Sequence, residues 1–160
     1  MIIREMTNLD IQQIKKIAFD TWRDTYSSFI PTEIQDQVLA DAYSDEEMNH
    51  RFSHSLNLVL ESNGAILGYA FFSGDLFNPD IYLESLYIHP DHQGKGIGKQ
   101  LIQAGVAKYR NPKAITLVVY KGNTSISFYE KVGFSVIKEN NGDFFGHPVV
   151  FIVMKKELEG

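Results

Sequence analysis

Three glycines lie within five residues, at Gly94, Gly96 and Gly98. The apolar segment Ile81–Ile88 before them is typical of a strand and Ile97–Tyr109 after them of a helix, so the glycines form the turn between the two. Glycines let the chain turn tightly and aim successive N–H groups at one place, and a helix N-terminus adds unpaired N–H groups and a positive dipole end. These features of the segment are typical of a phosphate-binding loop.

Two common phosphate loops do not fit this spacing. A P-loop requires Ser or Thr after its Gly-Lys pair, but Gly98-Lys99 is followed by Gln100, so the hydroxyl that binds magnesium is absent. A dinucleotide fingerprint requires G-x-G-x-x-G and an acid about 20 residues further on. The spacing here is G-x-G-x-G, and that later position falls in the apolar run 117–119. A glycine-rich surface turn without a ligand stays open as an alternative.

A third pattern, Q/R-x-x-G-x-G/A, is matched by Gln93, Gly96 and Gly98. In this the chain resembles the Gcn5-related N-acetyltransferases (GNAT), whose loop of this form binds the pyrophosphate of coenzyme A. A second segment, TSISFYEKVGF at 124–134, resembles the family's F-Y-E-K-x-G-F signature. The order of strands and helices from Leu56 to Lys155 also matches the family.

The resemblance implies a transfer of the acetyl group from acetyl-CoA to a primary amine that attacks the thioester directly. A chain without cysteine suits a reaction without an acyl-enzyme. The backbone of Leu86, Tyr87 and Ile88 would pair with the pantetheine arm, and an N–H of this stretch, that of Ile88 above all, would polarise the thioester. This requires the strand to splay from its neighbour. The implied pyrophosphate loop consists of Gln93, Gly94, Lys95, Gly96, Ile97 and Gly98.

Three further site residues are implied by the resemblance. Tyr129 takes the place of the family's general acid, with a packed aromatic beside Phe128 as the alternative. Glu84 lies two residues before Leu86, so strand alternation places both on one face. In the polyamine-acetylating branch a glutamate at this place contacts the amine; whether Glu84 is a base, a substrate ligand or a solvent-facing residue stays open. Asn123 resembles an asparagine that binds the coenzyme arm, although strict spacing would select Gly122.

The acceptor side is expected near the first helices. Trp22, Tyr26 and Phe29 stand at i, i+4 and i+7, which predicts one aromatic helix face. This face is either core packing or a wall that binds an aliphatic amine, with Trp22 and Tyr26 as its substrate-binding residues. The first third of the chain is rich in acids, which is typical of a solvated face and would also attract a cationic acceptor.

Three functions follow as alternatives. The first is an acetyl-CoA-dependent N-acetyltransferase acting on a small, polyamine-like amine, loosely like the spermidine and spermine acetyltransferase branch. The second is a peptide or protein N-terminal acetyltransferase. The third is a non-catalytic acyl-CoA-binding module. The expected partners are acetyl-CoA and a small amine, with a homodimer through the apolar strand around Val149–Met154 as a further expectation.

Composition narrows the class of protein. The 160 residues have a near-average hydrophobic share and predict a single domain over 1–160. The net charge of −5 argues against a nucleic-acid partner. No metal is expected, because His50 and His54 stand at i, i+4 without a further ligand set. No apolar run reaches the roughly 20 residues of a membrane span and no signal segment opens the chain, so a cytoplasmic location without a membrane partner is expected.

These patterns predict an α/β protein with a mixed, centrally splayed sheet of about seven strands and flanking helices, the GNAT-like acyl-CoA N-acyltransferase fold. Thr7 with Asp10 predicts a capping box at the first helix. The other expected elements are a strand at Met1–Glu5, a helix at Thr32–Phe52, a hairpin of Leu56–Glu61 and Ala65–Ser73, a strand at Ala114–Tyr120, a helix at Thr124–Val132, and strands at Phe134–Glu139 and Val149–Lys155 joined by a loop around 140–143.

Overall fold

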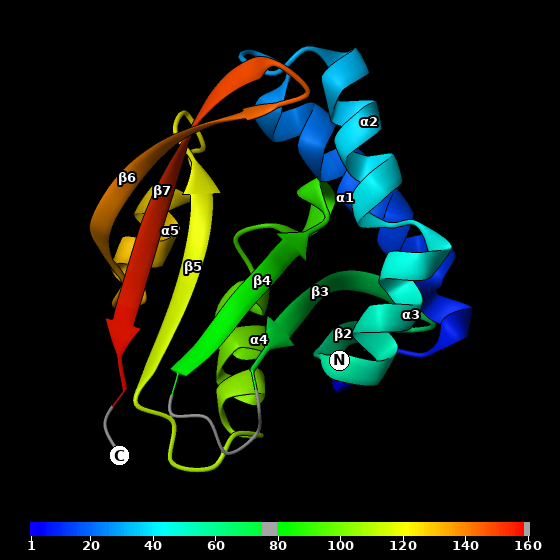
Figure 1. Cartoon of the computed structure of the whole chain (residues 1–160). Coiled ribbons are helices and arrows are strands. Elements are labelled where there is room, and N and C mark those ends of the chain that lie inside the picture. The colour runs from blue at the N-terminus through cyan, green and yellow to red at the C-terminus, as the bar shows by residue number, and fades with distance from the viewer. Residues whose placement is uncertain (75–79, 159–160) are drawn as a thin grey trace.

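The computed structural model describes residues 1–74 and 80–158, and it contains a seven-stranded mixed sheet with helices on both faces (Figure 1). The strand order is β1-β2-β3-β4-β5-β7-β6. The strands are β1 (Ile2–Glu5), β2 (Leu56–Ser62), β3 (Ala65–Ser73), β4 (Asp80–Ile88), β5 (Ala114–Tyr120), β6 (Ser135–Phe144) and β7 (His147–Glu157). The helices are α1 (Ile11–Tyr26), α2 (Thr32–Ala42), α3 (Asp45–His54), α4 (Ile97–Val106) and α5 (Ile126–Lys131), with short 3₁₀ turns η1 (Asn8–Asp10) and η2 (Pro90–His92).

Strand β3 shows how the sheet divides two cores. Its residues Ala70 and Phe72 face the side covered by α4 and α5, whereas Tyr69 and Phe71 face the side covered by α1 and α3. All four are fully buried. Because strand side chains alternate between faces, a run of consecutive apolar residues is what a strand covered on both faces requires.

The centre of the sheet is splayed between β4 and β5. These parallel strands pair only from Asp80 to Leu83 and from Ala114 to Leu117. Beyond that point β4 continues beside β3 and β5 continues beside β7, and Figure 1 shows the two strands diverging. The predicted mixed, splayed sheet is confirmed.

A β-bulge lies where β4 leaves β5. Phe71 of β3 is opposite Ser85 and Phe72 is opposite Leu83, so Glu84 is an extra residue in β4. Leu86 packs into the core on the α4 side, while the Glu84 carboxylate binds Arg51 of α3 on the other side. The prediction that Glu84 and Leu86 share a face was wrong, because the extra residue shifts the alternation by one.

The predicted helix Thr32–Phe52 is two helices. The chain leaves α2 at Tyr43, and Ser44 then caps α3 by accepting a hydrogen bond from the N–H of Glu47 at 3.2 Å. Ser followed by three acids is an N-terminal helix signal, and it outweighs the amphipathic pattern that runs through it.

The final hairpin differs from its prediction as well. The polar run 140–143 belongs to β6 and pairs with residues 148–151 of β7. The turn lies later, at Phe145 and Gly146, which both have positive φ (51° and 87°), the geometry of a two-residue hairpin turn. Because β7 pairs with β5 on one side and β6 on the other, it is an interior strand, and β6 forms the open edge of the sheet.

The predicted capping box at the start of the first helix is confirmed, in the η1 turn that leads into α1. Asp10 accepts hydrogen bonds from the N–H of Thr7 at 2.8 Å and from both terminal nitrogens of Arg4 at 2.8 and 2.9 Å. The Arg4 guanidinium holds the pKa of this buried carboxyl below its usual range, although burial acts in the opposite direction. Among the described residues, no helix is both long and apolar enough to cross a bilayer.

We predict that Asp10→Asn lowers the free energy of unfolding by about 1–3 kcal/mol at pH 7, because it removes the charge from a buried, hydrogen-bonded pair. The pKa of Asp10 is lower in the folded state than in the unfolded state, where it is about 3.9. The stabilisation is therefore fully present above the unfolded-state pKa and is lost as the pH falls through the folded-state pKa. Urea unfolding at pH 7 and pH 3 measures it, and the gap between variant and wild type should narrow at pH 3. The exposed Asp41→Asn serves as control, and an equal loss in both variants would contradict the prediction.

Candidate active site

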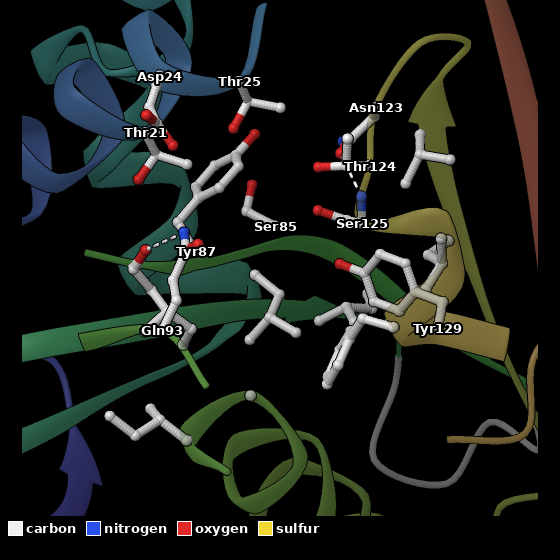
Figure 2. A pocket seen from close by; sticks show the side chains of 18 of the residues that line it. Thr21, Asp24, Thr25, Ser85, Tyr87, Gln93, Asn123, Thr124, Ser125 and Tyr129 are labelled. Carbon is white, nitrogen blue, oxygen red and sulfur yellow. Dashed lines mark hydrogen bonds between the residues drawn. The ribbon is translucent and has the colours of Figure 1, made fainter. Parts of the chain in front are cut away.

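A cavity of about 780 Å³ lies between the diverging ends of β4 and β5. Its walls come from α1, from β4, from the glycine loop with the start of α4, and from β5 with α5 (Figure 2). This volume is within the range of small-molecule and cofactor sites. The splay of the sheet therefore creates the site.

The glycine loop forms one end of this cavity. Gly94 and Gly96 have positive φ (81° and 77°), and Gly96 is the residue from which α4 begins. Gly98 lies in the first turn, where an added Cβ would come within 2.9 Å of the Phe128 ring, so a glycine is needed for α4 to pack on α5. The residues at the start of α4 line the cavity, so this helix N-terminus with its unpaired N–H groups lies at the cavity wall, as an anionic ligand requires.

The predicted loop residues differ in their placement. Gln93, Gly94, Gly96, Ile97 and Gly98 line the cavity.

Lys95 of the same loop is not part of the cavity wall. Its ammonium lies at the surface, 3.3 Å from Nδ1 of His92. The loop thus offers the cavity mainly backbone groups.

The edge of β4 offers further backbone donors. The N–H of His89 donates to Leu67 of β3 at 2.9 Å, and opposite residues in an antiparallel pair alternate between bonded and non-bonded. Ile88 and Leu86 consequently direct their N–H and C=O groups away from β3, toward the cavity. The Ile88 carbonyl accepts a bond from Gln93 Nε2 at 3.2 Å. An added strand-like ligand would find donors and acceptors here.

Tyr129 stands opposite this edge. Its side chain is buried and its phenol is directed into the cavity (Figure 2). Burial, with a smaller contribution from Tyr87, raises the pKa of this phenol above its usual value. Tyr129 is therefore protonated at neutral pH, the state in which a hydroxyl can donate a proton.

Asn123 and Gly122 both line the cavity near α5. The amide of Asn123 donates to the Tyr26 hydroxyl at 2.9 Å and accepts from the N–H of Ser125 at 2.8 Å. Its side chain thus ties α1 to the turn that follows β5. Both positions that the sequence offered for a contact with the coenzyme arm therefore lie on the cavity wall.

The aromatic residues of α1 take different places. Tyr26 lines the cavity, but Trp22 lies behind it, 3% exposed, with its ring centre 4.6 Å from that of Tyr26. Trp22 Nε1 donates to the hydroxyl of Tyr87 at 3.1 Å. Trp22 therefore supports the wall through Tyr26 and Tyr87.

A polar stripe next to these aromatics escaped the sequence analysis. Thr21, Asp24, Thr25 and Ser28 stand at i, i+3, i+4 and i+7 and all line the cavity. The first three come from α1 and, with Ser85 of the bulge, lie across the cavity from Tyr129 in Figure 2. Asp24 forms no ion pair with any described residue. The helical spacing of these polar residues is the sequence signal by which this wall could have been found.

Glu84 also lines the cavity, with its side chain 31% exposed. It forms an ion pair with Arg51, whose Nη2 is 2.8 Å from Oε1. Across residues 1–74 and 80–158, no group of three acidic or histidine side chains is arranged to hold a metal ion.

Comparison with known proteins identifies the family. The family model described as the acetyltransferase (GNAT) domain matches residues 24–158. An L-amino acid N-acyltransferase, MnaT of Escherichia coli (strain K12), is 32% identical over 64% of this chain and 64% of its own length, which is less than two thirds of that relative. A spermidine N(1)-acetyltransferase of Thermoplasma acidophilum is 26% identical over 98% of this chain and 97% of its own.

A solved structure agrees with these matches. The PaiA N-acetyltransferase of Thermoplasma acidophilum, solved in complex with coenzyme A, has a TM-score of 0.82 at 23% identity and covers 98% of both chains. The chain thus belongs to the GNAT acetyltransferases, enzymes that transfer an acyl group from acetyl-CoA to an amine. The predicted family, enzyme class and acetyl donor are confirmed.

We predict that Gly96→Ala weakens coenzyme A binding about tenfold, because a side chain at φ 77° costs about 1–2 kcal/mol and the relaxing backbone would redirect the N–H groups of the loop. Isothermal titration with coenzyme A measures the affinity. Gly64→Ala is the matched control, since Gly64 has φ 82° in the β2–β3 turn and, as at Gly96, no heavy atom beyond the neighbouring residues lies closer than 3.9 Å to an added Cβ. Equal affinities for both variants would contradict the prediction.

Proposed function

We propose that this protein acetylates a primary amine of a small cationic molecule. One observation carries the proposal: on the side of the cavity away from the glycine loop, the charged lining residues are the carboxylates Asp24 and Glu84. Within the described part of the chain, the basic residues that line the cavity are Lys99 and His92, which both lie at the glycine loop and the start of α4. Glu84 is paired with Arg51, whereas Asp24 has no ion pair among the described residues, so the acceptor half carries a net negative charge.

This charge distribution separates two kinds of acceptor. An amino acid carries a carboxylate next to its amine and would need a cation that lines the cavity on this side; Arg51 pairs with Glu84 but does not line the cavity. A diamine or polyamine carries a second ammonium, which an unpaired carboxylate such as Asp24 attracts. A relative that matches over nearly its full length is named for spermidine, which supports the second kind.

The proposed reaction forms a C–N bond and breaks the C–S bond of the thioester. Backbone N–H groups of Leu86 and Ile88 point away from β3 into the cavity and stabilise the negative charge that the carbonyl oxygen gains. Tyr129 gives its proton to the departing thiolate and regains one from solvent. Glu84 lines the acceptor half of the cavity, and its carboxylate accepts the amine's proton directly or through a water molecule.

The panel that tests the acceptor consists of spermidine, putrescine, free amino acids and a short peptide, with release of free coenzyme A thiol as the signal. We expect turnover of the polyamines, and Asp24→Asn should raise the KM for spermidine about fivefold to tenfold with little change in kcat. Asp41→Asn makes the same charge change outside the cavity and is the control. A preference for amino acids or the peptide would refute the cationic acceptor, and coenzyme binding without any turnover would favour a binding module.

Tyr129→Phe tests the proton donor. We expect kcat to fall about 10²-fold with an unchanged affinity for coenzyme A, because the phenol is removed while the ring is kept. Tyr109→Phe is the control, since Tyr109 has a buried hydroxyl without a hydrogen-bond partner in the described part of the chain and does not line the cavity. Full activity of Tyr129→Phe would show that the thiolate leaves without this acid.

A further inference from the structure

Arg51 is an almost fully buried cation beside the cavity. Its side chain is 6% exposed and comes from α3. Its Nε and Nη2 both donate to Oε1 of Glu84, at 3.0 and 2.8 Å. Arg51 itself does not line the cavity. It therefore makes no direct contact with a molecule in the cavity, and Glu84 is the lining residue that it hydrogen-bonds.

The guanidinium is held from several directions. Its Nη1 donates to the carbonyl of Ala42, the last residue of α2, and lies 3.4 Å from the sulfur of Met48. Its central carbon stands 4.8 Å from the ring centre of Phe71 and 5.3 Å from that of Tyr43, within cation–π distance. Helix α2, helix α3 and strand β3 thus fix one cation in place.

The ion pair uses only half of the Glu84 carboxylate. Both donors of Arg51 reach Oε1, and Oε2 has no hydrogen-bond partner among residues 1–74 and 80–158. Glu84 is also the extra residue of the β-bulge, so regular strand pairing does not define the direction of its side chain. The two hydrogen bonds from Arg51 supply that direction.

We propose that Arg51 is a positioning residue that anchors Glu84 through Oε1 and leaves Oε2 to meet the acceptor amine, directly or through one water molecule. The proposal rests on the acetyltransferase function proposed above. Without the guanidinium, the Glu84 carboxylate would be left half-buried and unpaired, and it would turn toward solvent and away from the amine. Displacing a reacting group by about 1 Å can cost about 10²-fold in rate.

A double-mutant cycle tests this role. Arg51→Met, Glu84→Gln and the double variant are compared by kcat/KM for the best cationic amine. We expect each single variant to lose about 10²-fold, and the double variant to lose no more than about threefold beyond Glu84→Gln alone, because Arg51 acts only through Glu84. Losses that multiply would show that Arg51 acts through the general packing of the fold, and would overturn the proposal.

Two controls separate positioning from stability. Arg4→Met breaks another guanidinium–carboxylate pair, with the buried Asp10, outside the cavity, and should lower stability while keeping kcat/KM. Arg51→Lys keeps the charge but not the two-point contact, and should recover part of the activity lost in Arg51→Met. Each variant's affinity for coenzyme A should stay within about twofold of wild type, which shows that the cavity has folded.

The possible failures are distinguishable. If the wild-type protein acetylates no cationic amine, the proposed function fails. If it does and Glu84→Gln is impaired while Arg51→Met is not, only the role of Arg51 fails.

Discussion

The structure depends on the point where β4 stops pairing with β5. A parallel pair that continued past Leu83 would bury its backbone groups in the sheet and leave no cavity. The bulge at Glu84 lies at this point and makes it possible, because an extra residue bends and twists the strand that carries it. The free backbone edge of β4 after the bulge and the position of the Glu84 carboxylate are therefore both consequences of this one extra residue.

The elements around the open sheet compensate for the backbone pairing that is missing between β4 and β5. Strand β5 pairs along its whole length with β7, so it keeps one complete set of ladder bonds. Helix α1 reaches across the gap, where Asn123 binds the hydroxyl of Tyr26. Aromatic rings of Trp22, Tyr26 and Tyr120 pack beside it with centres within 5.8 Å of one another. The cavity is consequently held open by a packed frame.

Local patterns predicted local structure well. The glycine loop and the strand and helix around it were readable because turn residues and apolar periodicity act over a few positions. The conformation around Glu84 could not be predicted in this way, because a bulge depends on the register between β3 and β4, and no short pattern encodes that register. Arg51 was missed for a similar reason: it is 33 residues from Glu84, and only the packing of α3 on the sheet brings the two together. The β6–β7 turn was misplaced because asparagine and glycine in 140–143 favour turns, whereas the long pairing partner kept them in a strand.

The two halves of the cavity are built from different parts of the polypeptide. The half at β4 and the glycine loop presents main-chain N–H groups, which every residue except proline supplies. The half at α1 and the bulge presents side chains such as Asp24 and Glu84, each replaceable by a single codon change. Selection can thus alter the half at α1 and the bulge while the half at β4 and the glycine loop is inherited almost unchanged. A duplicated gene with this fold therefore needs few mutations to accept a new amine and many to use a new acyl donor.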